Sequence, residues 1–102
     1  MSESEANLEN LSATFDKLND IREQSLTISR EIVRDCSKSI RNVHRNDVSG
    51  AEDHIKSAQK KLKDLKNICG EISEISYAGY VLDAEREFVE AVMFYNFEVK
   101  GI

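Results

Sequence analysis

Apolar residues recur at intervals of three and four along the first part of the chain, which is the spacing of an amphipathic helix. They are Leu8, Leu11, Phe15, Leu18, Ile21, Ile28, Ile32, Cys36, Ile40 and Val43. We expect this helix to begin near Ser2 or Ser4, since Ser2 and Glu5 have capping-box spacing, and to end near Arg45. It would be a rod of roughly 60 Å, which cannot bury its apolar stripe alone.

A turn at residues 46–50, with the sequence Asn-Asp-Val-Ser-Gly, separates the first helix from a second. Ser49 and Glu52 have capping-box spacing, so we expect the second helix to start there and to end at Gly70. Its apolar residues alternate in steps of four and three, like the a and d positions of a heptad. They are Ala51, Ile55, Ala58, Leu62, Leu65 and Cys69. The second helix should therefore pack lengthwise and antiparallel on the first.

A third helical stripe follows, with Gly79 as a weak point near its start and Gly101 as its expected cap. The stripe consists of Ile72, Ile75, Tyr77, Val81, Ala84, Phe88, Ala91, Tyr95 and Val99. After Phe88 the other faces of this helix also become apolar, through Val89, Met93, Phe94 and Phe97. A helix that is apolar all round is buried on several sides, so we expect partner subunits or a further segment to cover it.

Composition agrees with an all-α protein, because the chain has no proline and only four glycines. Its 102 residues suffice for one small domain, residues 1–102. The predicted fold is therefore an elongated, antiparallel three-helix chain that completes its core by oligomerisation.

The net charge and the two cysteines limit which partners and which cellular compartment are expected. The net charge of −5 means that any nucleic-acid binding must come from local segregation of basic residues. Cys36 and Cys69 lack metal-ligand spacing, which favours free thiols in a reducing compartment, so a cytoplasmic protein is expected. No apolar run approaches the ~18 residues of a membrane span, and the acidic N-terminus is unlike a signal peptide.

Five basic residues share one face of the first helix and form what we call the basic ridge. They are Arg30, Arg34, Lys38, Arg41 and Arg45. On a helical wheel they lie within about 80° of one another and roughly opposite the apolar stripe. Like charges four residues apart cost ~0.2–0.5 kcal/mol a pair, so the ridge favours a polyanionic partner such as a phosphate backbone. The alternative is a solvated face, partly neutralised by Glu31 and Asp35.

Three carboxylates share a strip of the third helix, because Asp83, Glu87 and Glu90 are spaced i, i+4 and i+7. In one interpretation Glu87 and Glu90, with help from Asp83, bind Mg²⁺ or Mn²⁺, since hard cations prefer oxygen ligands. In the other, Arg86 pairs with Asp83 and Glu90 while Glu87 faces solvent. Spacing alone leaves both open.

The remaining polar residues have simpler interpretations. His44 and His54 lack partners at metal-ligand spacing, and Lys56, Lys60 and Lys63 read as solvated lysines of an amphipathic helix. Neither a Ser-His-Asp arrangement nor a glycine-rich phosphate loop can be assembled, so classical nucleophilic catalysis is not expected.

Two segments resemble motifs of the translin family, specifically its translin-associated factor X branch. Residues 29–40, S-R-E-I-V-R-D-C-S-K-S-I, with V-H-R at 43–45, are similar to S-R-D-I-x-x-E-S-K-R-x-I followed by L-H-R. Residues 87–92, with Phe94 and Phe97, are similar to Q-E-Y-V-E-A-V-x-F-x-x-F. The resemblance runs from about Asn10 to the C-terminus.

The resemblance implies an all-α subunit of a hollow oligomer that binds single-stranded RNA or DNA. In the factor X branch it further implies a Mg²⁺-dependent endoribonuclease. Glu87 and Glu90 match the two motif glutamates that help to hold the metal, and they are the candidate catalytic residues. Arg30, Lys38 and Arg45 match basic positions of the first motif.

The resemblance covers only the N-terminal half of the family fold, whose C-terminal helices carry a further metal-binding acid. Arg34 and Arg41 also depart from the motif, because they replace uncharged residues and enlarge the ridge. Either a second polypeptide supplies the missing helices, or this chain binds nucleic acid without cutting it. The expected partners are therefore more copies of this chain or a second translin-family chain. The rival interpretation is a structural helical adaptor with neither activity.

Overall fold

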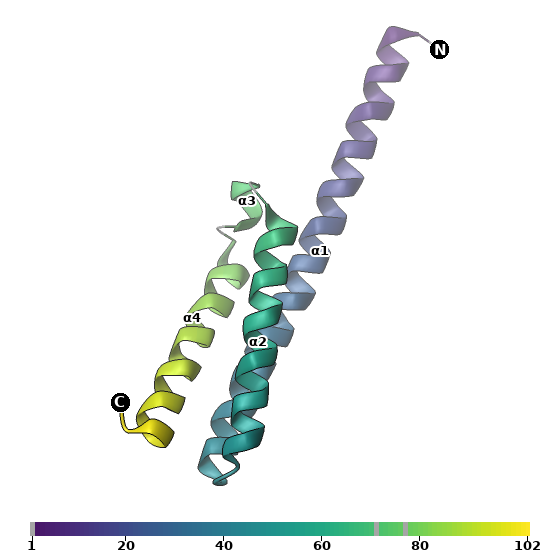
Figure 1. The fold of residues 1–102 in the computed structure, drawn as a ribbon. Coiled ribbons are helices and arrows are strands. Elements are labelled where there is room, and N and C mark those ends of the chain that lie inside the picture. Colours follow the sequence, from purple (N-terminus) through teal and green to yellow (C-terminus); the bar gives the residue numbers. More distant parts are fainter. Residues whose placement is uncertain (1, 71, 77) are drawn as a thin grey trace.

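The chain is a bundle of helices in a computed structural model that describes residues 2–70, 72–76 and 78–102. The elements are α1 (Glu3–His44), α2 (Val48–Cys69), α3 (Ser73–Ser76), α4 (Gly79–Tyr95) and the π-helical turn η1 (Asn96–Lys100). The described residues include no strand, and the molecule measures 67 × 18 × 16 Å. The prediction of an elongated all-α chain is therefore confirmed (Figure 1). No helix in the described ranges has the length and apolarity needed to cross a bilayer.

The long first helix forms as predicted. Its N-cap is Ser2, whose Oγ accepts a hydrogen bond of 3.2 Å from the Glu5 amide. The first turns of α1 extend beyond the other helices (Figure 1). We call residues 3–17 the N-terminal arm. Its apolar residues Leu8, Leu11 and Phe15 are exposed, which contrasts with the buried stripe of the rest of α1.

The predicted lengthwise packing of α2 on α1 is confirmed, and polar side chains take part in the contact. Both helices carry small buried residues: Ser25, Ser29, Cys36 and Ser39 on α1, and Ala51 and Ala58 on α2. The Ser39 hydroxyl donates a 2.9 Å hydrogen bond to the Ala51 carbonyl, and Ser25 Oγ lies 3.4 Å from Cys69 Sγ. The burial of these serines was not predicted, because the stripe was defined from apolar residues alone and serine is polar.

The start of α2 corrects one prediction. The helix begins at Val48 and its N-cap is Asp47, not Ser49, because Asp47 Oδ1 accepts a 3.0 Å hydrogen bond from the Gly50 amide. A Cβ at residue 50 would collide with the Asp47 carboxylate and, at 2.5 Å, with the Asn42 amide nitrogen. A larger residue at position 50 would therefore require the side chains of Asp47 and Asn42 to move, and Asp47 is the cap.

The third helix is interrupted where Gly79 was the expected weak point. A single turn, α3, precedes α4, which begins at Gly79. Gly70 ends α2 with φ 53°, and Gly101 ends η1 in the left-handed region with φ 70°, so both predicted glycine stops are confirmed. Tyr77, which the pattern assigned to the apolar stripe, lies outside the described residues.

Helix α4 packs against both long helices and leaves an apolar outer face. Val81, Ala84 and Ala91 are buried against α1 and α2. Leu82, Val89, Met93 and Phe97 are exposed. This exposure agrees with the predicted excess of apolar surface on the third helix, and its coverage by oligomerisation stays a prediction.

Replacing the observed cap should destabilise the chain, whereas replacing the expected one should not. We predict that Asp47→Ala lowers the free energy of unfolding by about 1 kcal/mol, because the Gly50 amide loses its partner. Ser49→Ala is the matched control. Urea unfolding followed by circular dichroism measures both variants, and an equal loss in the two would contradict the assignment of Asp47.

Candidate functional site

The basic ridge lies on the outer side of α1. Four of its members are exposed and Lys38 is half-buried. Within the described part of the chain, none of the five forms an ion pair. Their positive charges therefore stand in a row, and none is paired with an acidic side chain of residues 2–70, 72–76 and 78–102.

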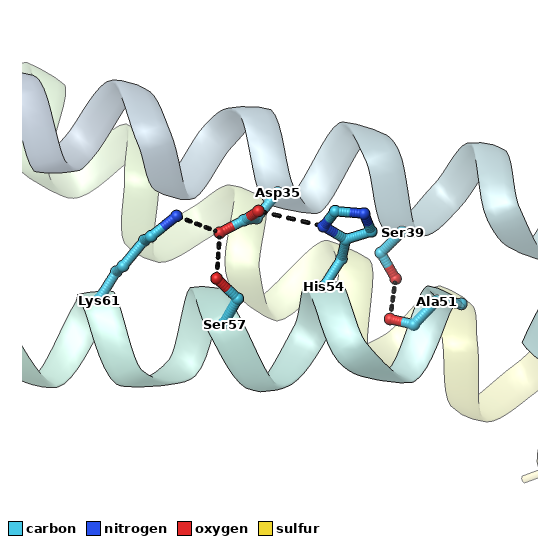
Figure 2. A network of polar contacts seen from close by, with 6 residues as sticks. All are labelled: Asp35, Ser39, Ala51, His54, Ser57 and Lys61. Atoms are coloured by element: carbon cyan, nitrogen blue, oxygen red, sulfur yellow. Dashed lines mark hydrogen bonds and ion pairs between the residues drawn. The ribbon is translucent and has the colours of Figure 1, made fainter. Parts of the chain in front are cut away.

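Asp35, which the sequence suggested as a neutralising neighbour of the ridge, points the other way (Figure 2). Asp35 is only 7% exposed, and its carboxylate faces α2. Lys61 Nζ and Ser57 Oγ each donate to Asp35 Oδ2 at 2.8 Å, and His54 Nδ1 lies 3.1 Å from Oδ1. The expected contribution of Asp35 to neutralising the ridge is therefore wrong, because α2 already supplies its partners.

Electrostatics around Asp35 favour the ionised form. Burial acts to raise its pKa, but hydrogen bonds from Lys61, Ser57 and His54, together with the charge of Lys61, outweigh burial and hold the pKa below its usual value. The pattern was visible in the sequence. Asp35 lies three residues after the buried Ile32, and its partners recur on α2 at intervals of three and four.

The carboxylate strip divides into two parts. Arg86 lies 3.3 Å from Asp83 and 3.9 Å from Glu90, and all three side chains are more than half exposed. Glu87 is half-buried and lies on the α1 side of α4, near Cys36. The pKa of the Cys36 thiol is raised to about 11, mainly by burial and further by the negative charge of Glu87. In the described residues no group of three or more side chains is arranged to hold a metal ion.

One residue of the basic ridge, Arg30, and one of the carboxylate strip, Asp83, line the same groove between α1 and α4. Near one end the groove is lined by Ser29, Arg30, Val33, Tyr80 and Asp83. Further along, the His44 and Phe94 rings pack with centroids 5.3 Å apart. These contacts show that α4 runs parallel to α1.

The cysteines and histidines have structural roles, as the sequence suggested. Both cysteines are free and buried. The raised pKa of Cys36 keeps its thiol protonated near neutral pH. His54 contacts Asp35 and His44 packs on Phe94, so each contributes to helix packing.

Comparison with known proteins finds a partial relative. The chain is similar to a protein of Methanocaldococcus jannaschii that is itself described only as uncharacterized, with 34% identity over 76 residues. The match covers 74% of this chain and 33% of the relative, so the chain spans about a third of the length of the protein it matches. No protein-family profile and no solved structure matches the chain.

Removing the charge of Asp35 should destabilise the α1–α2 contact in a pH-dependent way. Because folding lowers the pKa of Asp35, the ionised carboxylate stabilises the fold above the unfolded value of about 3.9, and this contribution is lost as the pH falls through the lowered folded value. We predict that Asp35→Asn lowers the free energy of unfolding by about 2 kcal/mol near pH 7 and by less near pH 3. Urea unfolding at both pH values measures this.

The exposed Asp53 on α2 gives the matched control. Asp53→Asn should change the free energy of unfolding by less than about 0.5 kcal/mol at either pH. A loss for Asp35→Asn that is the same near pH 3 as near pH 7 would show that packing, and not charge, holds the two helices together there.

Proposed function

We propose that the chain binds single-stranded RNA or DNA along the basic ridge. The observation that carries the proposal is the row of five basic side chains on the outer side of α1 that have no acidic partner in the described part of the chain. The resemblance of residues 29–45 to the first translin motif supports the same function.

The ridge suits a phosphate backbone for physical reasons. A single uninterrupted helix carries the first four ridge residues and Arg45 is its C-cap, so the charges follow one line of about 22 Å. Phosphates would relieve the repulsion between basic residues four apart and release condensed counterions. Because the ridge contains no aromatic side chain on which bases could stack, it would read the backbone more than the base sequence.

A second candidate function is metal-dependent cleavage of the bound strand. It is suggested by Asp83, which lines the same groove as Arg30 of the ridge, and by Glu87, which lies close enough to Cys36 of α1 for its charge to act on that thiol. Two carboxylates, with Asp83 as a helper, fit the oxygen preference of Mg²⁺ or Mn²⁺, which retains several waters when bound. Such an ion activates water for attack on a phosphodiester. Arg86 would have to release Glu90 to the cation, and further ligands would come from a completing chain.

The oligomeric state belongs to the proposal as well. Either more copies of this chain or a second translin-family chain would cover the apolar face of α4 and complete the metal site. A structural helical adaptor is the rival, and it predicts neither nucleic-acid nor cation binding.

Reversing two ridge charges should weaken binding of single-stranded RNA. We predict that Arg34→Glu with Arg41→Glu lowers affinity about tenfold or more, because two phosphate contacts become repulsive. The slope of log affinity against log salt should fall by about 0.7 for each lost contact. Fluorescence anisotropy with a labelled oligonucleotide, from about 50 to 200 mM salt, measures both quantities.

A variant with the same charge change elsewhere gives the control. Lys17→Glu with Lys100→Glu alters the net charge equally, at two exposed lysines outside the ridge. It should retain most of the affinity and the wild-type salt slope. Equal losses of RNA affinity in the two double variants would show that binding depends on overall charge. No loss of affinity in the ridge variant would favour the structural helical adaptor instead.

Neutralising the strip should weaken cation binding. We predict that Glu90→Gln or Glu87→Gln lowers the affinity for Mn²⁺ about tenfold or more, because each removes one ligand. Glu98→Gln, at an exposed glutamate of η1, is the control. Isothermal titration calorimetry measures the affinity, and a Mg²⁺-supplemented ribonuclease assay with Glu90→Ala tests cleavage. Unchanged Mn²⁺ affinity in both variants would remove the metal from the proposal.

A further inference from the structure

The N-terminal arm of α1 carries an apolar seam with no cover. Leu8, Leu11 and Phe15 are 66%, 66% and 59% exposed, and they recur at the spacing of a coiled-coil seam. The next residue of the seam, Leu18, is half-buried and packs against the core. The seam therefore continues the line of the core beyond the point where the other helices end.

Three of the four acidic residues of the arm are concentrated on one side of this seam. On a helical wheel Glu5, Glu9 and Asp16 lie within about 40° of one another, next to the line of Leu8. None of the three forms an ion pair with another described residue. The arm is thus an amphipathic helix with an apolar edge and an acidic edge.

A groove between α2 and α4 has the complementary character. We call it the lysine groove, and it is lined by Lys56, Gln59, Lys60, Leu62, Lys63, Lys66 and Phe88. Leu62 and Phe88 also pack against the core, so they form an apolar floor. Lys56 pairs with Glu52, whereas Lys60, Lys63 and Lys66 have no ion-pair partner among the described residues.

We propose that the N-terminal arm of one copy of this chain docks in the lysine groove of a second copy. The apolar seam would cover Leu62 and Phe88, and the acidic edge would meet the lysines. The arm from Glu5 to Asp16 and the groove from Lys56 to Lys66 each span about 15 Å of helix, so their lengths match. One contact would therefore bury both exposed apolar surfaces and pair their opposite charges.

The occupant must come from another molecule, because α1 is one continuous helix and its arm cannot fold back onto its own bundle. Pairing two chains antiparallel about a two-fold axis brings each arm to the groove of the other at the same time. A parallel pairing would bring together one arm and one groove and leave the second arm free. A closed antiparallel dimer is therefore the arrangement that the geometry supports.

This dimer does not depend on nucleic-acid binding by the basic ridge. The basic ridge lies roughly opposite the buried stripe of α1, against which α2 and α4 pack, so it remains open in the dimer. A nucleic acid in the lysine groove would use the lysines but would leave Leu8, Leu11 and Phe15 uncovered. The apolar arm thus favours a second copy as the occupant.

A charge exchange between two variants tests the contact. The arm variant carries Glu9→Lys and Asp16→Lys, and the groove variant carries Lys60→Glu and Lys63→Glu. Sedimentation velocity of the complete chain should show a dimer for the wild type and a dissociation constant raised about tenfold or more for either variant alone. Mixing the two variants should restore a dimer, since each basic arm then meets an acidic groove and each acidic arm a basic one.

The other outcomes each contradict the proposal in a distinct way. Wild-type dimerisation in both variants alone would place the interface elsewhere, and a mixture that stays monomeric would exclude arm-to-groove pairing. A wild-type chain that is monomeric, with a groove variant that loses single-stranded RNA binding, would assign the groove to nucleic acid instead. Circular dichroism melting confirms that each variant is folded. A ridge that fails to bind RNA would leave the dimer result unaffected.

Discussion

The buried carboxylate of Asp35 is the interaction on which the rest of the structure depends. Lys61, Ser57 and His54 surround it from one face of α2, so all three contacts are made in only one register of α2 along α1. An ionised group with so little exposure is costly unless it is paired, which penalises any shifted register. The small buried residues of α1 and α2 let these two helices approach closely. The two helices together then form the surface against which α4 packs.

Because Asp35 points toward α2, it does not neutralise the basic residues on the outer face of α1. Because its carboxylate is satisfied by α2, the basic ridge keeps its charge on the opposite side of the same helix. Helix α1 thus has three separate roles along one rod: a buried seam, a basic outer face and an acidic arm. A single rigid helix suits this division, since it keeps the three surfaces at constant spacing.

The groove between α1 and α4 brings the two candidate chemistries together. Arg30 and Asp83 line the same stretch of it, and Glu87 lies further along near Cys36. Within the isolated chain Arg86 already contacts Asp83 and Glu90, at distances and exposures typical of weak surface ion pairs. A cation or an anionic strand would therefore displace interactions of small free energy.

Spacing along one helix was enough to predict the helical class, the Ser2 cap, the stops at Gly70 and Gly101 and the alignment of the ridge, since each depends on neighbours within a few residues. Which way Asp35 and Glu87 point depends instead on the helix lying opposite. The same holds for the buried serines, which are polar by sequence and interior by packing. Asp47 replaced Ser49 as the cap because the turn geometry, with Gly50 against Asn42, set where α2 begins. The sequence alone thus determined the faces of each helix, and only the tertiary structure decided which faces meet, because contacts between helices join residues far apart in the chain.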